Sequence, residues 1–359
     1  VRKSRLDQVY VFLHIISGHL TQAERANQPI GALTDDQNVY GAAFREYLQG
    51  LIRLYRDEPE AALESLAYFR RTPSRRYIQD RRAAIDAMAC LTLSCQLLGR
   101  AGEAATALQV LREYVSGTGD SRLSILVDSA VARMDALRGC ADSSVRWAET
   151  AEFPFDTTML WFLDTPWITA CRVRITEGSA AGLKRAEEEL HQLAKLNEAH
   201  HNDIKLTEIL CLLAVACHLQ GDTEATQEHL GRALTLARRG GVVLPFVEWS
   251  PSLAKVMLEI LPDDSDWLTK RIRHILSGRP AGSRAAQPVV DALTNREFEG
   301  LEFLAKRLYD KEIAKELGIS IETVKTHMKH IREKLGVANR REAATKALEL
   351  GLLRNRSSS

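Results

Sequence analysis

Apolar positions in the first 240 residues recur with a helical period, and a turn signal interrupts them about every 40 residues. The turn signals, each leading into an alanine-bearing helix, begin at Gly18, Asp57, Arg100, Gly139, Glu177 and Gly221. Long helices are predicted before the turns, as at 40–56, 78–98 and 204–220, and second helices after them, as at 61–70, 103–115 and 224–239. Helix pairs at a fixed period form an α-solenoid. We therefore predict an all-α solenoid over residues 1–240.

The repeated units resemble tetratricopeptide (TPR) repeats with lengthened helices. Most of the aromatic and proline marks of that family are absent, so armadillo-like or other helix pairs remain open for the detail. The prediction of a TPR-like solenoid therefore rests on the period and on the helix pairs.

The pattern changes after the repeats. A proline-bounded turn at 245–251 leads to predicted helices at 253–261 and 267–276, and we interpret 241–276 as a helical cap of the solenoid. Residues 277–290 are rich in Gly, Pro, Ser and Ala and contain no large apolar residue before their last two positions. This composition is typical of a flexible linker.

A short and a longer amphipathic helix, separated by a tight turn, are predicted within residues 310–336. The first covers 311–317 and has an apolar face of Ile313, Ala314 and Leu317. Gly318 can adopt the left-handed conformation that ends a helix. Ser320 then stands where an N-cap oxygen accepts from the first free amides of the second helix.

The second helix has two different sides. Its apolar stripe is formed by Val324, Met328, Ile331 and Leu335. Its outward positions are Glu322, Lys325, Thr326, Lys329 and Glu333. A short helix, a turn and a longer helix with lysines on its free face form a helix-turn-helix, which places the second helix in the DNA major groove. The alternative is a helix side that is simply solvated.

The flanking residues add two further predicted helices. Thr294 and Glu297 form a capping box that opens one of them, and its apolar positions are Phe298, Leu301, Leu304 and Ala305. An alanine-rich helix follows at 340–350, closed by Gly351. We predict a domain of four helices over residues 291–356.

These residues resemble the LuxR-type DNA-binding domain over about residues 291–353. The motifs that carry the resemblance are 293–299 (LTNREFE), 311–314 (KEIA), 319–320 (IS), 323–327 (TVKTH), 334–337 (KLGV) and 351–352 (GL). The resemblance implies that Lys325, Thr326 and Lys329 face bases, and that Lys311, Ser320 and Thr323 hold phosphates. It also implies that the last helix makes a dimer contact. Tyr309 and Asp310 replace the more usual Ser-Asn, which is expected to keep a capping residue.

The whole arrangement resembles the C-terminal half of the MalT-like, large ATP-binding LuxR regulators, in which an ATPase module precedes a helical-repeat sensor. No G-x-x-x-x-G-K-[ST] motif occurs, so no nucleotide site is expected in these residues. The chain begins with Val1 and is expected to be a piece of something longer or a protein without that module. The resemblance implies that the repeats bind a small-molecule inducer or a regulatory protein and control self-association.

Composition and charge fit a DNA-binding domain on a nearly neutral body. The chain has 359 residues, of which 45% are hydrophobic and 26% charged, and a formal net charge of +1. From Asp291 onward there are 14 Lys and Arg against 11 Asp and Glu, so that part carries +3 and the remainder −2. This asymmetry is weak by itself, and the position of the lysines matters more.

No signal peptide or membrane span is expected, because the most apolar run, 209–219, is shorter than the ~20 residues that cross a bilayer. The six cysteines lack C-x-x-C spacing and are expected to be buried, reduced thiols: Cys90, Cys95, Cys140, Cys171, Cys211 and Cys217. Both features predict a cytoplasmic protein.

No catalytic, cofactor or metal site is predicted. His200, His201 and Asp203 lie together, but no third strong ligand is evident and a solvated loop is the simpler interpretation. The densest aromatic cluster comprises Phe153, Phe155, Trp161, Phe162 and Trp167. It is interpreted as repeat packing, with an apolar pocket wall as the alternative.

Two functions follow from these patterns. The first is a sequence-specific transcriptional regulator, expected to be an activator, that binds a two-half-site operator as a homodimer. The alternative is a helical-repeat scaffold for protein binding, whose last domain only tethers it to DNA or to another chain. Salt-dependent, sequence-selective DNA binding favours the first.

Overall fold

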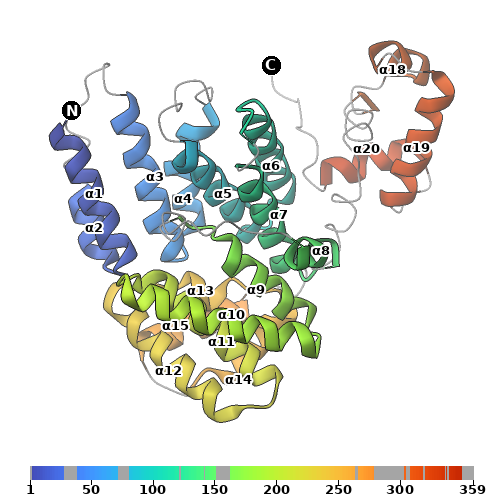
Figure 1. The fold of residues 1–359 in the computed structure, drawn as a ribbon. Coiled ribbons are helices and arrows are strands. Elements are labelled where there is room, and N and C mark those ends of the chain that lie inside the picture. The colour runs from blue at the N-terminus through green and yellow to red at the C-terminus, as the bar shows by residue number, and fades with distance from the viewer. Residues whose placement is uncertain are drawn as a thin grey trace. The chain divides into compact units, whose positions relative to one another are not determined.

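The fold is given by a computed structural model, in which the chain divides into two compact units (Figure 1). The first holds Val1–Leu98 and Ala107–Pro280, and the second holds Ala281–Ser359 together with Gly99–Thr106. The structure describes residues 2–27, 39–71, 81–120, 123–140, 142–150, 162–262, 266–278, 303–304, 308–317, 320–335, 337 and 339–349.

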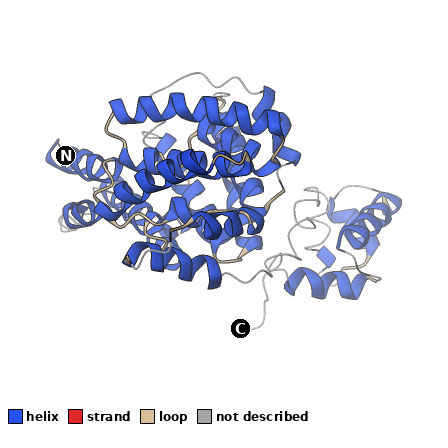
Figure 2. Cartoon of the chain, turned by 90° about the horizontal axis from the view of Figure 1, so that it is seen from below, coloured by secondary structure: helices blue, strands red, loops and turns tan. Residues whose placement is uncertain are grey.

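The described helices up to Gly240 form six consecutive pairs, which belong to the first unit apart from the first residues of α6. The pairs are α1 (Arg2–Ile16) with α2 (Leu20–Asn27), α3 (Val39–Tyr55) with α4 (Pro59–Arg71), α5 (Arg81–Leu97) with α6 (Ala101–Ser116), α7 (Ser124–Arg138) with α8 (Asp142–Thr150), α9 (Pro166–Glu177) with α10 (Ala180–Ala199), and α11 (Asp203–Leu219) with α12 (Thr223–Gly240). The described part of the chain contains helices and loops and no strand (Figure 2). The predicted all-α, TPR-like architecture is confirmed, and the helix ends given above lie within a few residues of these bounds.

The turn inside each pair contains a residue with left-handed backbone geometry. These residues are Gly18, Asp57, Gly99, Gly139, Gly178 and Gly221. The predicted turn signals begin at or within one residue of the same positions. The repeat therefore has a local cause, because each left-handed residue ends one helix and the following segment starts the next.

The odd-numbered helices stack in chain order from α1 to α11, and α1 also contacts α11. The first pair therefore meets the sixth. At this meeting point Gly240, the last residue of α12, lies against the backbone of Gly18, and a Cβ atom on Gly240 would be 1.5 Å from the Gly18 carbonyl oxygen. Only glycine fits so close to another backbone.

Residues 242–250, here called the inner segment, are all buried. The segment contains a one-turn helix, α13 (Leu244–Val247), where the sequence predicted only a turn. The Val243 N–H donates to the Tyr55 carbonyl of α3 at 2.8 Å, and α13 contacts α3 and α11. Helices α14 (Pro251–Ile260) and α15 (Trp267–Gly278) follow. The segment interpreted as a cap thus begins with a buried stretch that contacts helices of the second and the sixth pair.

A cluster of charged side chains surrounds the inner segment. This polar core consists of Asp86, Arg133, Asp164, Arg172, Lys205, Glu208 and Glu248, all of them buried. Arg133 on α7 donates from Nε and one terminal nitrogen to the two carboxylate oxygens of Glu248, at 2.7 Å each. Arg172 on α9 donates to the Glu248 carbonyl and to the Glu208 carboxylate, both at 2.9 Å. Lys205 donates to Glu208 at 2.8 Å.

The polar core also holds the irregular residues before α9. The Leu163 carbonyl accepts from Arg133 at 2.9 Å and from Lys205 at 2.6 Å. The Asp86 carboxylate accepts from the Asp164 N–H at 3.2 Å and from the Tyr47 hydroxyl at 2.7 Å. Two segments outside the paired helices are therefore fixed by charged side chains from four helices, α5, α7, α9 and α11.

The electrostatics of the polar core favour the charged forms of Glu208 and Arg133. Burial by itself would raise the pKa of Glu208, but the neighbouring charges of Lys205, Arg133 and Arg172 outweigh it and hold that pKa well below the ordinary value. Burial likewise opposes the charged form of Arg133, yet Glu248 and Glu208 raise its pKa. Glu208 and Arg133 thus keep their charges because each has opposite charges at hydrogen-bonding distance. Burial instead raises the pKa of Asp86, whose carboxylate accepts from the Tyr47 hydroxyl and the Asp164 N–H.

The thiol prediction is confirmed for five cysteines and wrong for one. All six are free, but Cys140 is exposed whereas the others are buried. Cys140 follows the left-handed Gly139 that ends α7, so it lies in a turn and not on an apolar helix face. Of the predicted aromatic cluster, Phe162 packs edge-on against Phe12 and Trp167 is half-buried, while its other members lie outside the described residues.

Candidate nucleic-acid interface

The second unit contains the predicted helix-turn-helix. Its helices are α18 (Asp310–Leu317), α19 (Ile321–Leu335) and α20 (Arg340–Glu349), and α19 contacts both of the others. The buried core comprises Leu304, Ile313, Ala314, Val324, Met328, Ile331 and Ala343. These residues confirm the predicted apolar faces of both helices, except that the side chains of Leu317 and Leu335 lie outside the described residues. The predicted helix that opens at Thr294 also lies outside them, apart from Phe303 and Leu304, which are helical.

Ser320 caps α19 as predicted. Its hydroxyl accepts from the Thr323 N–H at 3.0 Å and lies 2.8 Å from the Thr323 hydroxyl. The cap fixes where the helix starts, and therefore which residues face outward.

Ser320→Ala is expected to destabilise the second unit by about 1 kcal/mol, because it leaves an amide of the first turn without its acceptor. Ser320→Asn keeps a side-chain acceptor and serves as the control. Urea denaturation followed by circular dichroism of both variants measures the difference. Equal stability of the alanine and asparagine variants would contradict the capping role.

The outward side of α19 carries four exposed residues at helical spacing, Glu322, Lys325, Thr326 and Lys329, while the side chain of Glu333, also predicted to face outward, lies outside the described residues. We call these four residues the outer face of α19. It lies opposite the buried Val324, Met328 and Ile331, so each side chain of the face is directed away from the core. Lys325 and Glu322 form an ion pair with 3.2 Å between Nζ and Oε2. The Thr326 hydroxyl donates to the Glu322 carbonyl at 3.0 Å, so its polar group is bonded to the helix backbone.

The remaining predicted site residues lie at the entrances of the two helices. Lys311 is exposed in the first turn of α18, and Ser320 and Thr323 are exposed at the start of α19. All six predicted residues are therefore accessible, and five of them belong to α19 or its cap. Glu322 was predicted to face outward but was not assigned a role in the site.

The prediction that Asp310 caps α18 is wrong. The Glu312 carboxylate accepts from the Tyr309 N–H at 2.7 Å, whereas Asp310 forms an ion pair with Arg340 of α20 at 2.6 Å. Arg340 also donates to the Leu308 carbonyl. Asp310 is drawn away from the helix end because Arg340 offers it a charged donor. Nothing in the local sequence indicates this pairing of residues 30 positions apart.

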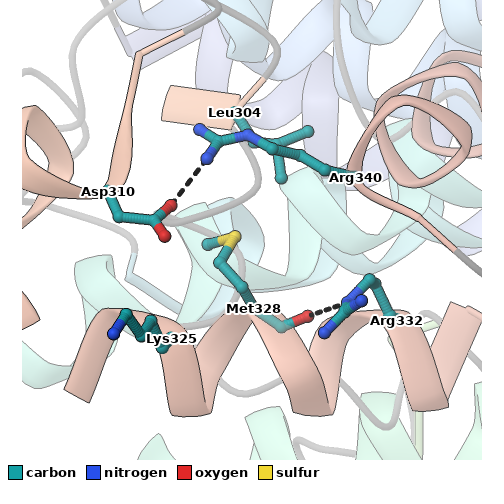
Figure 3. Close-up of a pocket in the computed structure, with 6 residues that line it drawn as sticks. All are labelled: Leu304, Asp310, Lys325, Met328, Arg332 and Arg340. Carbon is teal, nitrogen blue, oxygen red and sulfur yellow. Dashed lines mark hydrogen bonds and ion pairs between the residues drawn. The ribbon is translucent and has the colours of Figure 1, made fainter. Parts of the chain in front are cut away.

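A cavity of about 290 Å³ opens beside this ion pair (Figure 3). Its lining residues are Leu304, Asp310, Lys325, Met328, Arg332 and Arg340. Arg332 donates from Nε to the Met328 carbonyl at 3.2 Å, so it follows the helix backbone. Lys325 lines the same cavity as the Asp310–Arg340 pair, which joins α18 to α20.

Two alanines of α20 belong to the interior of the second unit, while the side chains of Ala347 and Leu348 lie outside the described residues. Ala343 is fully buried and Ala344 packs against the same core. The sequence left open whether these small residues form an internal core or a dimer contact, and the structure assigns these two to the core.

The described residues contain neither a candidate metal site nor a candidate membrane span. No group of three or more His, Cys, Asp or Glu side chains that could hold a metal ion occurs in the described ranges, where His200 and His201 are exposed. No helix among the described residues is long and apolar enough to cross a bilayer.

Comparisons with known proteins match both units. The family described as the MalT-like TPR region matches residues 13–262, and the family described as bacterial regulatory proteins, luxR family, matches residues 291–347. Similar curated proteins are HTH-type transcriptional regulators MalT. Those from Klebsiella pneumoniae and Yersinia pestis are 28% identical over 215 residues, and the one from Cronobacter sakazakii is 27% identical over the same length.

Each match covers 53% of this chain but only 23% of the relative. The chain thus corresponds to a minor part of the length of these relatives. The match to the repeat family extends over more than half of the chain. The luxR match includes α18, all of α19 with its outer face, and most of α20. The chain therefore belongs to the family with a MalT-like TPR region, and it ends in a helix-turn-helix domain of the luxR family of bacterial regulatory proteins.

Proposed function

We propose that the protein is a sequence-specific DNA-binding transcriptional regulator that inserts the outer face of α19 into the major groove. The observation that carries this proposal is the exposure of Lys325, Thr326 and Lys329 on one side of a helix whose opposite side is locked into a core. A helix with this division can approach base edges without disturbing its own domain.

Each residue has a defined task in this proposal. Lys325 and Lys329 donate to guanine O6 and N7, and the Thr326 methyl group contacts the methyl group of thymine. Lys311, Ser320 and Thr323 hold phosphates. For Ser320 and Thr323, the positive N-terminal end of α19 adds to the attraction. These roles divide the site into base contacts that specify and phosphate contacts that position.

The proposed organisation assigns residues 1–240 to TPR-like repeats, 241–276 to a helical cap, 277–290 to a linker and 291–356 to the DNA-binding domain. The repeats would bind an inducer or a regulatory protein, as expected for a sensor. Binding as a homodimer to two half-sites would enlarge an otherwise small interface. A DNA target implies that the protein acts in the cytoplasm, and the names of its relatives support transcriptional regulation.

Lys329→Ala is expected to weaken binding of the full chain to a selected duplex by about 1–3 kcal/mol and to relax specificity at one base pair. Lys315→Ala, which removes the same charge from an exposed position on α18, serves as the control. Gel-shift titrations with the selected duplex and with random duplexes measure both effects. A loss shared equally by all duplexes would assign Lys329 to phosphate. Unchanged binding to every duplex would refute the assignment, and failure of the unaltered chain to bind would leave the scaffold function.

A further inference from the structure

The outer face of α19 contains one acid among its cationic and neutral residues. Glu322 lies three residues before Lys325 and four before Thr326, so it belongs to the same exposed stripe. Its side chain is 82% exposed. Because the N-terminal residues of a recognition helix approach base edges, Glu322 must enter the groove together with the two lysines.

A carboxylate in the major groove has few acceptable neighbours. Phosphates repel it, and guanine N7 and O6, adenine N7 and thymine O4 are acceptors that cannot donate to it. Amino groups are the donors on the base edges, and the cytosine N4 amino group is the usual partner of Glu and Asp. An ionised side chain at this position therefore tolerates some base pairs and penalises the others.

The ion pair with Lys325 makes the penalty depend on the DNA sequence. In the free protein Lys325 neutralises Glu322 at 3.2 Å. On a random duplex, Lys325 must break this ion pair to bind a phosphate. The Glu322 carboxylate then has no cationic partner and is repelled by the DNA phosphates. On a duplex with a guanine and a suitably placed cytosine, Lys325 donates to the guanine and Glu322 accepts from the cytosine amino group.

We propose that Glu322 is a specificity-determining residue, which selects a cytosine next to the base contacted by Lys325 and opposes binding to other sequences. This proposal rests on the proposed function, since it requires α19 to enter the groove. It assigns the acid a role in discriminating between sequences, by lowering affinity for duplexes that lack the cytosine.

The test uses the full chain, a library of randomised duplexes and three variants. Glu322→Ala removes the carboxylate, and Glu322→Gln replaces it with an amide that prefers adenine. Glu342→Gln is the matched control, because it removes a charge from α20 and its amide can still accept from the Asn339 side chain. Thermal unfolding of each variant verifies that the domain remains folded.

For Glu322→Ala we expect the selected cytosine to disappear and the ratio of specific to random affinity to fall by about 5- to 150-fold, the range of one base-pair contact. Affinity for random duplexes should rise, and its salt dependence should steepen by about one phosphate contact as Lys325 is released. Glu322→Gln should shift the preferred base to adenine, and Glu342→Gln should behave as the unaltered chain.

Two outcomes would overturn the role of Glu322. Either both variants select the same sequence with the same ratio as the unaltered chain, or Glu342→Gln reproduces their effect and net charge alone is responsible. Failure of the proposed function is recognised separately, because the unaltered chain would then enrich no sequence at all.

Discussion

Arg133→Met is expected to destabilise the repeat unit by about 3–5 kcal/mol, the loss found when one partner of a buried ion pair is removed. Arg133 is the bidentate partner of Glu248 and also lies 3.2 Å from Glu208. Methionine fills much of the volume but leaves Glu248 buried with only a distant cation, 3.8 Å away on Arg172. Denaturant unfolding, followed by far-UV circular dichroism, measures the change.

The control is Arg185→Met on α10. Arg185 also bonds a carboxylate, Glu189, at 2.9 Å, but both side chains are partly exposed and such pairs contribute ~0–1 kcal/mol. The double variant Arg133→Met, Glu248→Leu should be less destabilised than the sum of the two single changes, since it removes both charges together. A loss for Arg133→Met no larger than that of the control would show that the polar core does not stabilise the fold.

Gly240→Ala is expected to cost about 3 kcal/mol, even though alanine favours a helix more than glycine does. The added Cβ would lie 1.5 Å from the Gly18 carbonyl oxygen, and this neighbour is backbone that cannot rotate away. The first and the last helix pairs would have to separate. A lowered thermal midpoint and faster proteolysis of the repeat unit report this separation.

Gly231 lies on the same helix with nothing within 4 Å of a Cβ atom, so Gly231→Ala is the matched control. Its substitution should be neutral or stabilise by about 0.5–1 kcal/mol. The interpretation of the contact between Gly18 and Gly240 fails if both variants change stability in the same direction and by the same amount.

Both predictions concern contacts that an ordinary solenoid lacks. Repeat proteins are stabilised mainly by neighbouring units, so that their ends unfold independently. Here two contacts join parts of the repeat unit that are far apart in the chain. They are the contact of α1 with α11 and the ion pair of Arg133 with Glu248, 115 residues apart. We expect the repeat unit to unfold more cooperatively than a linear array of the same number of pairs.

The sequence alone determined the elements and the exposed face. The left-handed turns recur with a fixed spacing because each helix pair needs one, so the repeat is visible as a pattern. The division of α19 into Val324, Met328 and Ile331 on one side and Lys325, Thr326 and Lys329 on the other follows from the helical period. Ser320 was predictable as a cap because an N-cap bonds an amide only three residues away.

Only the tertiary structure decided which distant groups meet. Arg133 and Arg172 are visible in the sequence as charged residues within helices, but nothing near them in the chain names Glu248 as their common partner. The same holds for Asp310 with Arg340 and for Gly18 with Gly240. Periodicity and capping report interactions within one or two helical turns, whereas these contacts join residues that are far apart in the chain and meet only when the helices of each unit pack together.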